Sequence, residues 1–181
     1  TGAKWSVNGK WAVMYDPIAQ VWNKFDGATG KVVNISDAIG YPMFMESYDK
    51  PAPAPAYGIA GWTADGNNVF LYDAYDWWKI DLTGERQPEC LTKGYGRKHG
   101  KSIRKMTSNI DKDVFQKDEK VIVSLWDKDT MDEGVYQLDM KGRLRKLMEG
   151  NYVYTIHRFS DNHEYCVWNR QNVSEFRDLW W

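Results

Sequence analysis

The sequence has few cysteines and histidines and no long hydrophobic run, and each scarcity excludes a class of protein. Its two cysteines, Cys90 and Cys166, are too few for a disulfide framework in a chain of 181 residues and lack the C-x-x-C spacing of a zinc site. We expect two separate buried thiols; the alternative, a single disulfide, would imply an oxidising compartment. No apolar stretch approaches the roughly 18 residues of a transmembrane helix.

The sequence also lacks an excess of either positive or negative charge. The 24 basic and 25 acidic residues give a net charge of −1, which argues against a dedicated nucleic-acid binder, because such proteins carry a basic excess or stripe. The chain opens Thr1-Gly2-Ala3-Lys4, with no methionine and no apolar segment of a signal peptide. This opening predicts a processed product or an engineered fragment.

Aromatic residues are abundant instead. Ten Trp, eleven Tyr and six Phe make up 15% of the chain, and aromatic side chains favour strands. Fifteen Gly and six Pro supply turns, while long helix-forming stretches are absent. The composition therefore predicts an all-β protein.

An internal repeat is the most informative feature of the sequence. A polar turn followed by an apolar strand occurs four times, in residues 6–16, 63–73, 117–127 and 160–168. Asn8-Gly9 and Asp65-Gly66 are hairpin-turn pairs, because such turns require positive φ. The strand after each turn is nearly all apolar, as expected for a strand buried on both faces.

Two further marks complete each unit. A second strand runs into Asp26, Asp81 or Asp139 and a glycine-bearing turn, and the recurrence of these aspartates predicts a structural Asx-turn rather than catalysis. A last short strand ends at Ile35-Ser36, Leu91-Thr92 or Leu147-Met148, and the first residues of these pairs are spaced 56 apart twice. A leading strand is expected before each later turn, at 59–62, 113–115 and 154–159.

Four antiparallel strands repeating at this pitch predict a β-propeller blade. The fold class is thus an all-β partial propeller of about three to four four-stranded blades, spanning 1–181 as one domain. The blades are expected at roughly 3–36, 58–92, 113–148 and 154–181, the last incomplete. Propellers typically close a ring of about four to eight blades, so we expect the chain to end inside a larger propeller.

Two insertions separate the blades. Residues 37–57 contain Lys50-Pro51-Ala52-Pro53-Ala54-Pro55, which predicts an extended connector, with a docking motif as the alternative. Residues 93–112 contain a basic stretch from Gly94 to Lys101. We interpret this stretch as a solvated loop; the alternative is a contact for an anion or an acidic peptide.

An ordered series of segments resembles a known family. The series is Tyr57-Gly58-Ile59-Ala60-Gly61-Trp62, Leu71-Tyr72-Asp73, Asp76-Trp77-Trp78-Lys79-Ile80-Asp81, Leu91-Thr92, Gly94-Tyr95-Gly96-Arg97-Lys98 and Ser174-Glu175-Phe176-Arg177-Asp178-Leu179-Trp180. Together the segments resemble the propeller region of bacterial serine peptidases of the prolyl oligopeptidase family, of the dipeptidyl or acylaminoacyl peptidase type in gut Bacteroidetes. Departures occur at Val7-Asn8, where the family has Pro-Asp, at Glu119 in place of glycine, and at Arg177 in place of proline.

The resemblance implies a peptidase for a longer parent protein and no chemistry for this chain. In the family, the Ser, Asp and His triad belongs to an α/β-hydrolase domain that follows the propeller. The G-x-S-x-G nucleophile elbow of such a domain does not occur here, so no catalytic residue is predicted, and binding residues stay unassigned. The implied role is gating and positioning of peptide substrates over a hydrolase domain in cis, without a cofactor, in the periplasm or at the cell surface.

The sequence also contains candidate metal ligands. The histidines, His99, His157 and His163, share no metal-ligand spacing with one another or with the cysteines. His157 lies in an apolar strand and is expected to be hydrogen-bonded in the core or channel. Four acidic residues crowd one loop, and oxygen ligands of this kind suit calcium, but their spacing is not that of an EF-hand. These residues are Asp127, Asp129, Asp132 and Glu133.

The tryptophans allow two interpretations. Aromatic faces stack on sugars, but strand tryptophans are expected to pack between blades. The strand set is Trp11, Trp62, Trp78, Trp126 and Trp168, whereas the positions of Trp22, Trp77, Trp180 and Trp181 are left open.

Two functions from other classes remain as alternatives. One is a stand-alone propeller that binds a protein or glycan; the other is a propeller glycosidase, which needs paired carboxylates in the central channel. A partial propeller would also expose one bare sheet face and unpaired strand edges, so we expect self-association.

Overall fold

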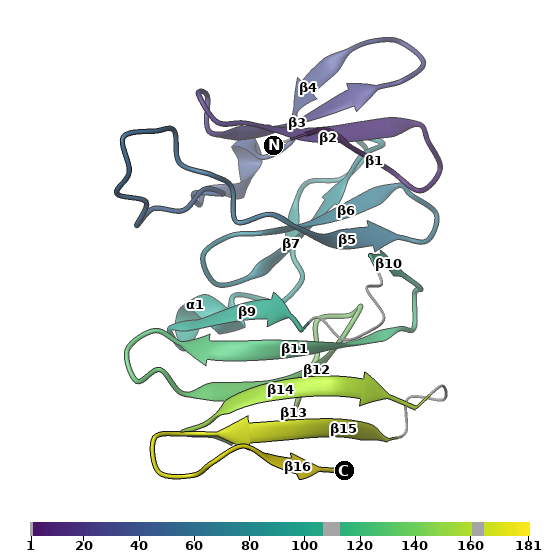
Figure 1. The fold of residues 1–181 in the computed structure, drawn as a ribbon. Helices are drawn as coiled ribbons and strands as arrows, with labels where there is room; N and C mark the ends of the chain where they lie inside the picture. Colours follow the sequence, from purple (N-terminus) through teal and green to yellow (C-terminus); the bar gives the residue numbers. More distant parts are fainter. Residues whose placement is uncertain (1, 107–112, 161–164) are drawn as a thin grey trace.

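The structure is a computed structural model that describes residues 2–106, 113–160 and 165–181, and it consists of four successive β-sheets (Figure 1). The first two sheets come from the first half of the chain except for one strand, β10 (Val114–Phe115). In the first, the strand order is β1 (Lys4–Trp5), β2 (Trp11–Asp16), β3 (Val21–Asp26) and β4 (Val32–Asn34). In the second, it is β10, β5 (Ile59–Thr63), β6 (Asn68–Tyr72), β7 (Trp77–Asp81) and β8 (Glu89–Cys90).

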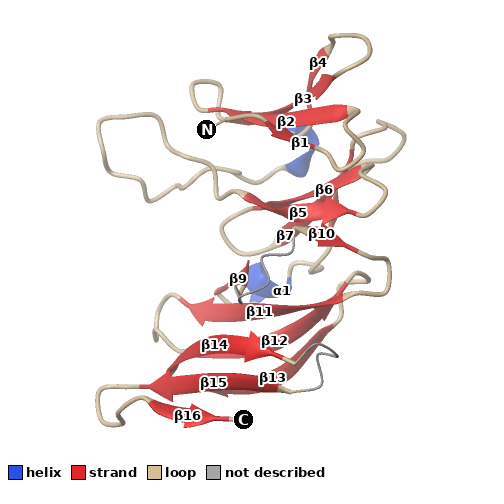
Figure 2. Cartoon of the chain, turned by 45° about the vertical axis from the view of Figure 1, so that its right-hand side comes forward, coloured by secondary structure: helices blue, strands red, loops and turns tan. Residues whose placement is uncertain are grey.

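The last two sheets follow the same up-and-down pattern. The third has the order β13 (Leu144–Gly150), β12 (Glu133–Asp139), β11 (Lys120–Asp127) and β9 (Lys101–Lys105). The fourth has three strands, β14 (Val153–Phe159), β15 (Cys166–Gln171) and β16 (Asp178–Trp180). Among the described residues, helical structure is limited to the 3-10 turn η1 (Asp37–Ile39) and the short helix α1 (Tyr95–Lys98), which lies beside β9 (Figure 2).

The sheets stack in chain order, and a hydrophobic core fills each space between them. Strand β6 shows why: its side chains alternate between two cores. Val69 and Leu71 pack toward the first sheet, whereas Phe70 and Tyr72 pack toward the third. A smaller core containing Val135 joins the third sheet to the fourth. The predicted strand buried on both faces is confirmed in β6.

The predicted turns form as expected. Gly9 and Gly66 both have φ of +69°. The hydroxyl before each turn accepts the backbone N–H that re-enters the strand, Trp11 N–H to Ser6 Oγ at 3.1 Å and Asn68 N–H to Thr63 Oγ1 at 3.0 Å. Adjacent turns also touch, since Asn8 Nδ2 donates to the carbonyl oxygen of Asp65 at 2.8 Å.

The Asx-turn prediction is also confirmed. Asp26 Oδ1 accepts the backbone N–H groups of Ala28 and Thr29, which hold the pKa of this carboxyl below its usual range. Asp81 accepts N–H groups from three residues that follow it, and Asp139 accepts those of Lys141 and Arg143. These carboxylates close hairpins.

The leading strand of the third blade was predicted wrongly. Residues 113–115 do not join the third sheet; β10 pairs in parallel with β5 of the second sheet. The inner strand of the third sheet is β9, paired antiparallel with β11, and it lies in the predicted insertion 93–112, where no strand was expected. The basic stretch 94–101 was also predicted wrongly as a loop, because Tyr95–Lys98 form α1. The sequence Lys101-Ser102-Ile103-Arg104-Lys105 hides a strand because only Ser102 and Ile103 are buried.

In the third unit, the residue pair that was predicted to end the last strand, Leu147-Met148, is shifted by one position relative to its partner strand. The register between β12 and β13 slips between Val135 and Tyr136, so Met148 lies opposite Val135. Leu147 is left in the bulge and is 42% exposed. A β-bulge adds one residue to one strand and leaves the pairing on either side intact. The spacing of the repeat does not reveal such an insertion, so it pointed to Leu147.

The chain is therefore a partial β-propeller, as predicted, with successive antiparallel sheets that stack through shared cores. Among the residues described, no helix is long and apolar enough to span a membrane.

Candidate functional site

The predicted candidates for metal binding do not converge. His157 Nε2 lies 2.6 Å from Asn169 Nδ2, which confirms the expected hydrogen-bonded histidine. His99 follows α1, and its ring stacks on Tyr95 with centroids 4.3 Å apart. His163 lies outside the described residues. Within the described ranges, no group of three or more His, Cys, Asp or Glu side chains could hold a metal ion.

The acidic loop is held together by its own hydrogen bonds. Asp127 Oδ1 accepts the N–H groups of Asp129 and Thr130, and these bonds lower the pKa of Asp127. Glu133 faces the fourth sheet instead, where it accepts the N–H of Tyr154 at 2.8 Å, and burial raises its pKa. Asp127 and Glu133 therefore serve separate structural contacts, and Asp132 Oδ2 accepts the hydroxyl of Thr130 at 2.9 Å. Cys90 and Cys166 are free thiols.

The tryptophans divide differently from the prediction. Trp62 packs between sheets as expected, but Trp126 is 40% exposed although it lies in a strand. Trp22 and Trp77, which the sequence left open, are among the buried core residues. The most buried tryptophans are thus bonded to the residues that follow the last strand of their unit. The Trp22 N–H donates to Ser36 Oγ, and the Trp77 N–H donates to Thr92 Oγ1.

The strongest polar feature lies where β6 ends and β7 begins, and we call it the aspartate cluster: the buried residues Asp73, Asp76 and Thr92, with the half-buried Arg97. Asp73 is 0% exposed. Its Oδ1 accepts the N–H groups of Tyr75 and Asp76, at 2.7 and 2.6 Å. Its Oδ2 accepts from Trp78 Nε1 and from the Arg97 guanidinium, both at 3.0 Å. Every lone-pair direction of this carboxylate is therefore occupied by the fold.

Asp76 anchors the start of α1. Its Oδ1 accepts from Thr92 Oγ1 at 2.6 Å and from Gly96 N–H at 2.9 Å, and its Oδ2 accepts from Arg97 N–H at 3.0 Å. A carboxylate is well placed at a helix start, where backbone N–H groups lack partners. Gly96 must be glycine here, because a Cβ would lie 2.6 Å from the carbonyl oxygen of Tyr75.

Arg97 connects the aspartate cluster to the long loop before β5. Its guanidinium carbon lies 3.8 Å from the ring centroid of Tyr41 and 5.0 Å from that of Tyr75. Partial burial acts to lower the pKa of Arg97, but the hydrogen bond and charge of Asp73 outweigh it and raise the pKa. Beside this stack opens a pocket of about 400 Å³, lined in part by Tyr41, Trp78 and Lys98.

A second arginine lies next to the aspartate cluster. Arg104 donates to the carbonyl oxygens of Ile103 and Asp73, both at 2.7 Å, and packs over the ring of Tyr72. Burial lowers the pKa of Arg104 and raises that of Tyr72 to about 12. Both groups keep their ordinary charge near neutral pH, so Arg104 places a positive charge beside the buried carboxylates.

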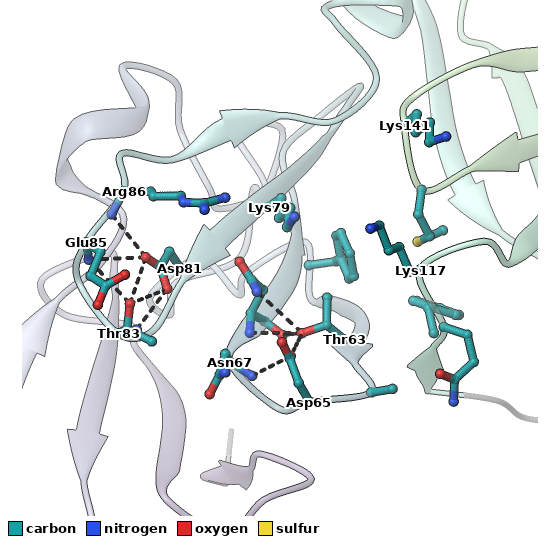
Figure 3. Close-up of a pocket in the computed structure, with 16 residues that line it drawn as sticks. Thr63, Asp65, Asn67, Lys79, Asp81, Thr83, Glu85, Arg86, Lys117 and Lys141 are labelled. Carbon is teal, nitrogen blue, oxygen red and sulfur yellow. Dashed lines mark hydrogen bonds between the residues drawn. The ribbon is translucent and has the colours of Figure 1, made fainter.

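A separate cleft of about 580 Å³ lies at the opposite ends of these strands, between the second and third sheets (Figure 3). Its walls are the β5–β6 and β7–β8 turns on one side and the segments before β11 and after β12 on the other. Cations line it, as Figure 3 shows for Lys79, Arg86, Lys117 and Lys141. This cleft was not predicted, because its residues come from four segments that are separate in the sequence, 63–70, 79–86, 115–117 and 140–141.

Comparisons with known proteins place the chain in no family. No family profile matches it, and no curated protein is similar in sequence. A solved structure with a related arrangement is regucalcin, a calcium-binding protein from Agrobacterium tumefaciens str. C58, with a TM-score of 0.41 and 11% sequence identity. The match covers 93% of this chain, and the chain spans about half (52%) of the regucalcin chain.

The aspartate cluster was only partly visible in the sequence. Asp73, Asp76, Thr92 and Arg97 all belong to segments that carry the family resemblance, but nothing in their spacing shows that they meet. The available signal was that an aspartate follows each apolar strand, at Asp16, Asp73 and Asp127. The second and the third of these are each followed by another aspartate that ends the loop, Asp76 and Asp132, so this signal does not single out the aspartate cluster.

Proposed function

We propose that this chain is a non-catalytic propeller region of a prolyl oligopeptidase-family serine peptidase, where it gates and positions peptide substrates over a hydrolase domain. The observation that carries the proposal is the convergence of the resembling segments. Residues 71–73, 76–81, 91–92 and 94–98 are scattered in sequence, yet they build one hydrogen-bonded aspartate cluster with a pocket beside it. Segments that meet in one hydrogen-bonded cluster support a relationship to the family more strongly than separate matches do.

The carboxylates of the aspartate cluster stabilise the fold and are not arranged for glycoside hydrolysis. A glycosidase needs one carboxylic acid that can donate a proton and one carboxylate that can act as base or nucleophile. Asp73 and Asp76 accept hydrogen bonds at both oxygens from backbone and side-chain donors. The alternative glycosidase function therefore gains no support from the most buried carboxylates of the described residues.

The experiment that tests the proposal is to read the gene beyond the codon for Trp181. We expect the frame to continue through further blades into a G-x-S-x-G segment followed by an Asp and a His. The serine of that segment in the encoded protein should then be labelled by a fluorophosphonate probe. A signal peptide upstream would support the proposed periplasmic or cell-surface location.

A frame that closes a propeller without a hydrolase domain would overturn the peptidase proposal. The alternative would then be a stand-alone binding propeller, and the same chain should be tested against immobilised peptides and a glycan panel. Selective retention by one of the two panels would identify the class of ligand.

A further inference from the structure

The cleft of Figure 3 gathers four cations, and the charge of one of them, Lys79, acts on the carboxylate of Asp65. Lys79 comes from β7, Lys117 from the turn before β11, and Lys141 from the turn after β12. Lys101, Lys105 and Lys146 elsewhere in the chain form ion pairs. Among the described residues, neither Arg86 nor the three cleft lysines form any ion pair. Unpaired like charges on converging segments favour a bound anion.

Three carboxylates also line the cleft, and all three, Asp65, Asp81 and Glu85, belong to the wall formed by the second sheet. The positive charge without a carboxylate on its own wall is therefore that of Lys117 and Lys141. Asp65 accepts from Thr63 Oγ1 at 2.5 Å and from Asn67 N–H at 2.9 Å, and these bonds lower its pKa. Burial acts to raise the pKa of Asp81, but hydrogen bonds from Thr83, Arg86 and Glu85 together hold it below its usual range. Both carboxylates stay ionised and directed at their own hairpins.

The rest of the lining defines what kind of anion fits. Phe70, Phe115 and Met140 contribute apolar surface, and Gln116 contributes an amide. In Figure 3, Lys79 lies between Arg86 on one side and Lys117 and Lys141 on the other, so the positive charge is spread along the cleft. A volume of about 580 Å³ is in the range of ligand sites. The cleft therefore suits an extended ligand with several negative groups and an apolar body.

Carboxylates fit this cleft better than phosphates. Phosphate sites typically use a cradle of backbone N–H groups or a helix start. Here the N–H groups of Asn67, Thr83 and Glu85 already bind Asp65 or Asp81. What remains is three flexible ammonium groups, which act as point charges, and one planar guanidinium.

We propose that this cleft binds an acidic peptide segment, with the carboxylates of at least two side chains paired to Lys79, Lys117, Lys141 or Arg86. The site lies at the opposite strand ends from the aspartate cluster. It does not depend on whether a hydrolase domain accompanies the propeller.

The test uses a fluorescein-labelled tetraglutamate peptide and the chain itself, with fluorescence anisotropy at low and at physiological salt. We expect saturable binding that weakens as salt rises. The Lys117→Glu/Lys141→Glu variant should bind about fivefold to tenfold more weakly, since each lost exposed charge pair costs a modest factor. The control variant Lys10→Glu/Lys31→Glu changes the net charge equally on exposed turns of the first sheet, and it should change affinity less than about twofold.

Three results would overturn the proposal. One is the absence of saturable binding at low salt, and another is an equal loss of affinity in the two double variants, which would mean nonspecific attraction. The third is stronger displacement of the probe by inorganic pyrophosphate than by unlabelled tetraglutamate, which would assign the cleft to phosphate. Tetraglutamine should not compete, and circular dichroism melts should show that both variants are folded.

Discussion

The second and fourth sheets are built from the same repeat but differ in burial. In the second sheet, β6 lies between neighbours on both sides, and four of its five residues are buried. In the fourth sheet, β15 has one buried residue, Asn169, and β16 has none. The comparison teaches that burial here comes from stacking, because a propeller sheet has two faces to cover and the fourth sheet has a described neighbour on one face.

The polar groups follow the same division. The second sheet contains the aspartate cluster, where Asp73 and Asp76 are buried and fully bonded. The fourth sheet places its ion pair, Arg170 with Glu175, near the surface. Buried charges need complete sets of partners, whereas exposed ones do not. A carboxylate that is buried between two sheets therefore contributes more to stability than one near the surface.

The largest effect is expected from Asp73→Ala. This change removes the carboxylate that accepts the Tyr75 and Asp76 N–H groups in the β6–β7 loop and leaves Arg97 without its partner. Breaking such a buried arrangement costs about 3–5 kcal/mol. Asp16→Ala is the matched control, because Asp16 holds the same position in the first unit and caps only Ile18 and Ala19 N–H groups. That control should cost about 1 kcal/mol. Urea unfolding monitored by tryptophan fluorescence measures both, and equal losses would contradict the comparison.

The next effect is expected from Gly142→Ala. Gly142 has φ of +80°, and a Cβ there would overlap the carbonyl oxygen of Leu91 in the neighbouring sheet. Strain and overpacking together should cost about 2–4 kcal/mol. Gly84 occupies the same place in the second unit, with φ of +84° and open space around it. Gly84→Ala should therefore cost only about 1 kcal/mol, and a similar cost for both variants would show that contact between sheets adds nothing.

A smaller effect is expected from acid. The pKa values of Asp26, Asp65 and Asp127 are lowered in the fold by hydrogen bonds at their turns. Their contribution to stability is present above the ordinary aspartate pKa of about 3.9 and is lost as pH falls through the lowered values. The urea midpoint should fall from about pH 5 toward pH 2, and less steeply in Asp65→Asn. A midpoint that stays constant below pH 4 would contradict this assignment.

The smallest effect on stability is expected from Leu179→Lys in β16. Leu179 is 59% exposed on a strand with one unpaired edge, so the free energy of unfolding should change by about 0.5 kcal/mol or less. Sedimentation velocity should nevertheless show concentration-dependent self-association of the unaltered chain and less of it in the variant, because lysine blocks edge pairing. Ile18→Lys, also exposed but in a loop of the first sheet, should leave association unchanged. A monomer at all concentrations before any substitution would refute the expectation.

Most of the fold could be predicted because each turn and strand of the repeat is determined by residues close together in the sequence. Asn8-Gly9 and Asp65-Gly66 need positive φ, and apolar runs such as 69–72 need burial on two faces, so turns and strands follow directly. The inner strand of the third sheet could not be predicted in the same way. Residues 101–105 are mostly basic, and their strand conformation depends on pairing with β11, which is a distant contact.

The candidate sites depended still more on the tertiary structure. The sequence by itself determined the repeat, the hairpins and the aspartates that close them, because each rests on residues a few positions apart. Only the tertiary structure decided which aspartates are buried, which tryptophans pack between sheets, and that Lys79 meets Lys117 and Lys141 across a cleft. The physical reason is that burial and charge proximity are set by the stacking of sheets, and stacking joins residues tens of positions apart.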